Sequence, residues 1–66
     1  MWSVLLEDID SAMGHLHEGA VISHEAYIDL LYAVKNEGVK LRAFPSKEDA
    51  LEWQGFYYPN ENQIVE

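Results

Sequence analysis

A chain of 66 residues that contains no cysteine has to be held together by its apolar residues, without disulfide bonds or a cysteine-based zinc site. Chains shorter than roughly 70–80 residues draw little surplus stability from a single core. Because 48% of the residues are hydrophobic and 12% are aromatic, a core can still form, and disorder is not expected. We therefore predict a single domain over residues 1–66, stabilised by close packing, by oligomerisation or by a bound partner.

The charge of the chain is strongly negative and unevenly distributed. Twelve acidic residues and four basic ones give a net charge of −8. Residues 1–34 have a charge of −6, residues 35–47 hold all four bases with one acid (+3), and residues 48–66 have a charge of −5. This distribution argues against direct binding to nucleic acid and favours a basic protein partner.

The spacing of apolar residues predicts three helices. In the first, apolar positions recur every three to four residues from Leu5 to Ala20. A short strand over Trp2–Leu6 is the competing interpretation of that segment. The last helix begins at Ser46, a favourable N-cap with Asp49 three residues later. The predicted helices span residues 4–18, 24–37 and 46–54.

Residues 39–44 alternate apolar and basic side chains, a pattern typical of a half-buried strand. A single strand leaves backbone groups unpaired, so this one needs a partner, either in a second copy or at Trp2–Leu6, Ala20–Ile22 or Phe56–Tyr58. The predicted fold class is α+β and mostly helical, with three helices and a minimal sheet around 39–44. The alternative is an all-α bundle. We expect residues 60–66 to form a loose tail.

No motif in the chain indicates catalysis, a metal or a cofactor. His15 and His17 would point in different directions on a helix, although in an extended segment they would lie on one side, with Glu18 or His24 able to join them. The chain lacks zinc-ligand spacings, a phosphate-binding glycine loop and a nucleophilic cysteine. The acidic clusters fall in the first turns of predicted helices, where carboxylates stabilise the helix dipole. We therefore expect that the protein is not an enzyme.

The densest group of candidate contact residues lies near the C-terminus, where four aromatic residues fall within residues 53–58. A domain this small cannot bury all of them. An exposed tyrosine beside carboxylates is suited to contact a basic protein surface. The predicted contact residues are Glu48, Asp49, Glu52, Trp53, Tyr57 and Tyr58, with Glu7, Asp8 and Asp10 as a second acidic group.

Three resemblances bear on function. One resemblance is to the Tyr-Tyr-Pro segment of bacteriocin nuclease immunity proteins, and it rests on the run Phe56–Pro59, followed by polar residues and Ile64–Glu66. This resemblance implies an acidic inhibitor that binds a basic nuclease. The helix that follows the motif in that family has no counterpart here. Residues 39–53 resemble the strand–helix unit of the viroplasmin or ribonuclease H hybrid-binding domain, which implies nucleic-acid binding and which the net charge contradicts. The short, acidic, cysteine-free profile is similar to that of phage-encoded anti-defence proteins such as anti-CRISPR proteins.

We therefore expect a protein-binding inhibitor, encoded by a phage or mobile element, that blocks a basic nuclease or defence effector by charge mimicry with an aromatic anchor. A cytoplasmic location is expected, because no apolar run approaches the ~18 residues of a membrane span and the N-terminus lacks a basic signal-peptide region. The alternative is a self-associating structural or regulatory protein, a homodimer built on strand 39–44 or on the apolar face of residues 27–34. A viroplasmin-like module or a small metal protein ranks below both.

Overall fold

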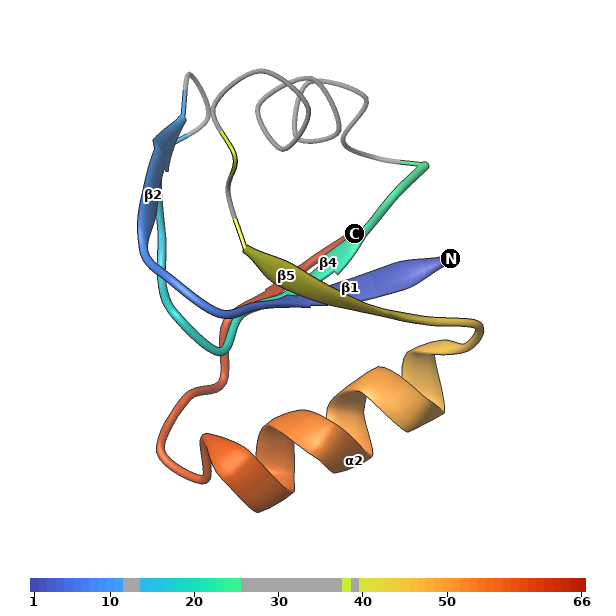
Figure 1. The fold of residues 1–66 in the computed structure, drawn as a ribbon. Coiled ribbons are helices and arrows are strands. Elements are labelled where there is room, and N and C mark those ends of the chain that lie inside the picture. Colours follow the sequence, from blue (N-terminus) through green and yellow to red (C-terminus); the bar gives the residue numbers. More distant parts are fainter. Residues whose placement is uncertain (12–13, 26–37, 39) are drawn as a thin grey trace.

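Two β-sheets and one helix make up the described part of the chain, which covers residues 1–11, 14–25, 38 and 40–66 of this computed structural model (Figure 1). No helix in these ranges is long and apolar enough to cross a membrane. The elements in chain order are β1 (Trp2–Leu5), β2 (Ile9–Ser11), β3 (Gly14–Leu16), β4 (Val21–Ser23), β5 (Leu41–Phe44), α2 (Lys47–Tyr57) and β6 (Ile64–Val65).

The larger sheet has the strand order β5-β1-β4-β6. β1 lies between two antiparallel neighbours, with Val4 opposite Val21 of β4 on one side and opposite Arg42 of β5 on the other. β6 pairs in parallel with β4, with Ile64 opposite Val21. Segments from both ends of the chain therefore belong to one sheet.

The smaller sheet is the hairpin of β2 and β3, in which Ile9 lies opposite Leu16 and Asp10 opposite His15. The hairpin occurs between β1 and β4 in the chain and extends away from the larger sheet (Figure 1). It returns the chain so that Leu16 packs in the same buried cluster as Leu5 of β1.

Apolar side chains cover both faces of the larger sheet. α2 lies across one face (Figure 1), where Val4, Val21 and Ala50 form a buried cluster. Because successive side chains of a strand point to opposite faces, the neighbours of these valines belong to a second cluster on the other face. The buried members of that second cluster are Leu5, Leu16, Ala20 and Ile22.

The prediction of a mostly helical domain is wrong, and so is the all-α alternative. Residues 4–18 form β1, β2 and β3 in their described part and not a helix. Leu5, Ile9 and Leu16, whose spacing suggested one helical face, do pack in one cluster, but strand pairing brings them together. Because both faces of the sheet are covered, consecutive residues of β1 are buried, so this strand lacks the alternation by which half-buried strands are recognised.

The other predicted elements have mixed outcomes. The strand predicted over 39–44 is found as β5 over Leu41–Phe44, with residue 39 outside the described residues, and its partner is β1, which includes most of the candidate segment Trp2–Leu6. The helix predicted over 46–54 begins as expected, with Ser46 as its N-cap, but it continues through Gly55 to Tyr57. The helix predicted over 24–37 lies outside the described residues from residue 26 on.

Two residues near the C-terminus, Ile64 and Val65, belong to the larger sheet as β6 and lie within the range 60–66 for which we expected a loose tail. Besides the pairing of β6, the Val21 amide donates to the Gln63 carbonyl over 3.0 Å. Gln54 is a buried residue of α2, and its Nε2 atom donates hydrogen bonds to the carbonyls of Gly19 and Gln63, at 2.9 and 3.2 Å. One side-chain amide thus joins α2 to the turn before β4 and to the segment before β6.

Replacing Gln54 tests this junction. Gln54→Met keeps most of the side-chain volume but removes the donor, so the carbonyls of Gly19 and Gln63 each lose one hydrogen bond, although Gln63 keeps the one from the Val21 amide. We expect the free energy of unfolding, measured by urea denaturation, to fall by about 1–3 kcal/mol. Glu52→Met, an exposed change on the same helix, should stay within about 0.5 kcal/mol. Equal stability of the two variants would contradict a structural role for Gln54.

Gly19 offers a second test, because it combines a φ of +92° with close contact to Tyr58. A Cβ atom added at Gly19 would lie 2.6 Å from Cγ of the tyrosine ring, whereas a Cβ added at Gly14, with φ +118°, meets nothing within 4 Å. Gly14→Ala should therefore cost only the backbone strain, about 1–2 kcal/mol. Gly19→Ala should cost about 1–3 kcal/mol more in thermal or urea unfolding, because of the overpacking. Similar losses of stability for the two variants would contradict an overpacking cost at the contact with Tyr58.

Candidate functional site

The sequence of α2 accounts for its position and for what it exposes. The Ser46 hydroxyl accepts a hydrogen bond from the Asp49 amide, and Glu48 and Asp49 lie in the first turn, where negative charge is favourable. Ala50 and Gln54 are buried against the sheet. The helix therefore has an inner face, flanked by the partly buried Leu51 and Trp53, and an outer side that faces solvent.

One exposed side of α2 combines acidic and aromatic residues. With Phe44 of β5, five helix residues at the spacing i, i+3, i+4, i+7 and i+8 line a shallow depression of about 320 Å³. Residues at this spacing share one side of a helix. We call this surface the acid–aromatic face; its residues are Phe44, Asp49, Glu52, Trp53, Phe56 and Tyr57.

The four rings of this face are in contact in series. The ring centroids of Phe44 and Trp53 are 5.9 Å apart, those of Trp53 and Tyr57 are 4.4 Å apart, and those of Tyr57 and Phe56 are 4.8 Å apart. These separations lie in or near the range of about 4.5–7 Å that is usual for aromatic pairs. Exposure increases along the series: Trp53 is half-buried, whereas Tyr57 is 58% and Phe56 77% exposed.

A cation of the chain itself lies against the inner end of this series. The guanidinium carbon of Arg42 is 5.7 Å from the ring centroid of Phe44 and 5.6 Å from that of Trp53. Both distances are within the ~6 Å at which a cation is attracted to the face of an aromatic ring. The rings of Phe44 and Trp53 therefore already contact a positive charge of the chain itself.

The structure brings together four of the six predicted contact residues near the C-terminus, namely Asp49, Glu52, Trp53 and Tyr57. Glu48 is exposed on the same helix but does not line the depression. Tyr58 turns inward, against Gly19, and packs at the cluster of Val4 and Val21.

Phe44 and Phe56 were not predicted as contact residues. Phe56 could have been found, because it follows Glu52 by four positions and Trp53 by three, which places it on their side of a helix that continues past Gly55. Phe44 has no such signal, because only the packing of α2 against β5 places it beside Trp53.

The acidic residues near the N-terminus have partners within the chain. Glu7 accepts a hydrogen bond from the Lys40 amide at 2.9 Å, and Asp8 accepts one from the Glu18 amide at 2.6 Å. Asp10 accepts one from Nδ1 of His15 at 2.8 Å. These three carboxylates hold loops and the hairpin in place, and they do not adjoin the acid–aromatic face.

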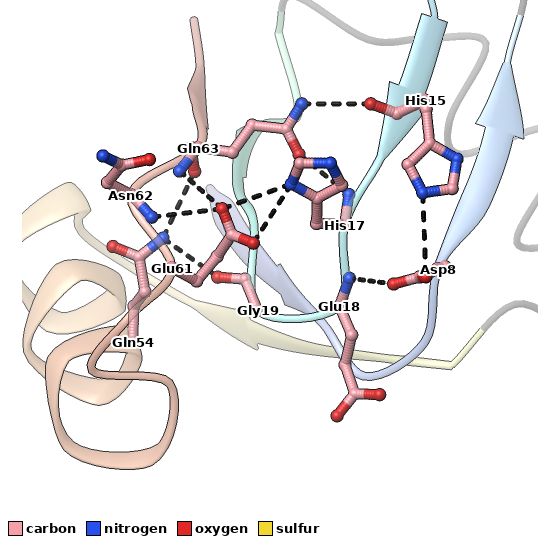
Figure 2. A network of polar contacts seen from close by, with 9 residues as sticks. All are labelled: Asp8, His15, His17, Glu18, Gly19, Gln54, Glu61, Asn62 and Gln63. Carbon is pink, nitrogen blue, oxygen red and sulfur yellow. Dashed lines mark hydrogen bonds and ion pairs between the residues drawn. The ribbon is translucent and has the colours of Figure 1, made fainter.

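Histidines and carboxylates form a polar network at the junction of β3 and the C-terminal segment (Figure 2). Nε2 of His15 lies 3.6 Å from Asp8, and Nδ1 of His17 lies 3.1 Å from Glu61. Gln63 accepts a hydrogen bond from the His17 amide at 2.8 Å and donates one to the His15 carbonyl at 3.1 Å. The network therefore attaches the hairpin to the segment that leads into β6.

The network was compared with the geometry that a metal ion requires. In the described ranges, no group of three or more His, Asp or Glu side chains is arranged to hold a metal ion. Asp10, through its hydrogen bond and its charge, raises the pKa of His15 together with the charge of Asp8. The pKa of Glu61 is lowered, first by the hydrogen bond from the Gln63 amide and then by His17.

His24 and Ser3 form a second polar pair, in which the Nε2 and Oγ atoms share a hydrogen bond. Burial, with the nearby N-terminal charge, lowers the pKa of His24. A histidine beside a serine hydroxyl is the pairing from which an activated nucleophile is built. Ser3, however, has no exposed surface, so a substrate cannot reach it, and the pair satisfies buried polar groups at the end of β1.

Comparison of this chain with protein-family models, with curated proteins and with solved structures returned no match. The residues themselves are therefore the basis for any functional assignment, and within the described ranges the acid–aromatic face is a surface at which the large apolar side chains of Phe56 and Tyr57 stay exposed.

The pKa values of His15 and His24 are shifted in opposite directions, so the two residues should affect the pH dependence of stability in opposite ways. His15, whose pKa is raised, stabilises the fold at pH values below 6.5, and this contribution is lost as the pH rises through its folded pKa. His24, whose pKa is lowered, stabilises it above pH 6.5, and this contribution is lost as the pH falls through its folded pKa. NMR titration of the imidazole signals should show His15 titrating above 6.5 and His24 below it.

Asp10→Asn provides the control, because it should return the His15 midpoint towards 6.5 and leave His24 unchanged. A His15 midpoint unaffected by this substitution would contradict the assigned cause of the shift.

Proposed function

We propose that this chain is a small protein-binding inhibitor that occupies the cationic surface of a nucleic-acid-handling protein, such as a nuclease or a defence effector. Its contact surface is the acid–aromatic face. The observation that supports the proposal is the exposure of Phe56 and Tyr57 directly beside the carboxylates of Asp49 and Glu52.

The exposed rings favour protein binding over a purely structural role. A 66-residue domain has few large apolar side chains with which to build a core, yet α2 turns Phe56 and Tyr57 towards solvent. Contiguous exposed apolar surface with a polar rim is typical of interaction sites. Aromatic residues in such sites supply much of the binding free energy once a partner excludes water from them.

The carboxylates give this surface its selectivity. The net charge of −8 attracts basic surfaces over a long range and repels the phosphates of nucleic acids. Asp49, Glu52 and the adjacent Glu48 place negative charge where it would meet the partner. A protein surface that normally binds nucleic acid presents arginine and lysine side chains, so an acidic ligand on it would exclude nucleic acid directly.

The proposal is tested by capturing the partner from the native host with the tagged chain. Captured protein should be basic, should dissociate when the salt concentration is raised from 0.15 to 1 M, where the Debye length falls from ~8 to ~3 Å, and should lose its nucleic-acid binding or cleavage in the complex. The Glu52→Lys and Glu48→Lys variants should bind it about tenfold more weakly or worse, because they place like charges in contact.

Glu25→Lys is the matched control, because Glu25 is exposed and lies outside the acid–aromatic face. The substitution changes the net charge by the same amount as Glu52→Lys. It should weaken binding much less. The proposal is wrong if binding of a captured partner does not weaken at high salt. It is also wrong if Glu48→Lys, Glu52→Lys and Glu25→Lys weaken binding equally.

A further inference from the structure

We infer that the depression of the acid–aromatic face is a binding site for one arginine side chain of the partner, held between the aromatic rings and the carboxylates of Asp49 and Glu52. This inference rests on the proposed function and names the group on the partner that the surface recognises. It is drawn from the chemistry of the lining, from the free carboxylates and from the position of Arg42.

The lining has the composition of a cation site. Four aromatic and two acidic residues line about 320 Å³, which is at the lower end of the ~300–1,000 Å³ of ligand pockets and suits a single side chain. Ring faces attract a cation through their quadrupoles, and carboxylates attract it through their charge. An uncharged apolar ligand would leave the two carboxylates beside it desolvated, which is unfavourable.

The two carboxylates remain available for a ligand. The ion pairs of the described ranges involve Asp8, Asp10, Glu61 and Glu66, and none uses Asp49 or Glu52. The hydrogen bond of Asp49 at the start of α2 uses its backbone amide, not its carboxylate. An incoming guanidinium group would therefore not displace an internal cation from either residue.

Arg42 provides an internal example of the same interaction. Its guanidinium group lies over Phe44 and Trp53, at the inner end of a ring series that continues to Tyr57 and Phe56. The rings of Tyr57 and Phe56 are more exposed to solvent. We assign the partner's arginine to this outer half of the series, beside Glu52, because planar guanidinium groups stack on ring faces and form forked hydrogen bonds with carboxylates.

The test uses Nα-acetyl-arginine amide as the probe and Nα-acetyl-citrulline amide as its uncharged counterpart of the same length, at matched chloride concentration. NMR titration of the full chain should show the arginine probe shifting the indole N–H signal of Trp53 and the ring signals of Phe56 and Tyr57. The dissociation constant should be on the order of millimolar, and citrulline should bind about two- to fivefold more weakly or not at all.

Two exposed substitutions separate the contributions of ring and charge. Tyr57→Leu keeps an apolar side chain but removes the ring, and Glu52→Gln removes the charge; each should weaken arginine binding about two- to fivefold. Glu48→Gln removes the same charge outside the depression and should leave the affinity unchanged. Equal binding of arginine and citrulline, equal effects of Glu52→Gln and Glu48→Gln, or shifts confined to the region of Asp8 and Asp10 would each overturn the inference.

The outcome can be distinguished from a failure of the proposed function. A captured basic partner that is released by Glu52→Lys, but is unaffected by Tyr57→Leu and by competition from the arginine probe, would leave the inhibitor proposal in place and disprove the arginine site. Arginine binding in the depression without any captured basic partner would support the site and disprove the inhibitor proposal.

Discussion

The buried amide of Gln54 is the interaction on which the arrangement of this domain depends. Its donated hydrogen bonds to the carbonyls of Gly19 and Gln63 join the helix, the turn before β4 and the segment before β6. Loss of a hydrogen bond at a buried carbonyl is costly, so this contact, together with the packing of Ala50 against Val4 and Val21, holds α2 in one orientation on the sheet. Because Gln54 and Ala50 face inward, Glu52 and Phe56 face outward, and the acid–aromatic face is a consequence of that orientation.

Two groups among the described acidic residues have different roles. Those near the N-terminus accept hydrogen bonds from backbone amides or from His15 and hold the hairpin and loops in place. Asp49 and Glu52 line an exposed depression with aromatic rings. The net charge of −8 is therefore partly a structural requirement of a small domain and partly a feature of one surface. The first group stabilises the fold, and the second is available to a partner.

Part of the fold could be predicted because its signals are local. Ser46 caps α2 through an interaction three residues away, and the alternation of residues 39–44 marks β5. At β1 the choice between a helix and the strand over Trp2–Leu6 could not be made from the pattern, because a sheet covered on both faces has no alternation in its central strand. Leu5, Ile9 and Leu16 pack together through strand pairing, and their spacing along the chain happens to match a helix as well.

The sequence by itself determined that α2 starts at Ser46, that a strand precedes it, and that acids and aromatic residues are concentrated near residue 50, because these features depend only on neighbouring residues. Only the tertiary structure decided which of those side chains point outward. Tyr58 packs against Gly19. The packing of β5 against α2 places Phe44 beside Trp53, and Arg42 lies over the rings of Phe44 and Trp53. Those positions depend on contacts between residues far apart in the chain, which no local pattern records.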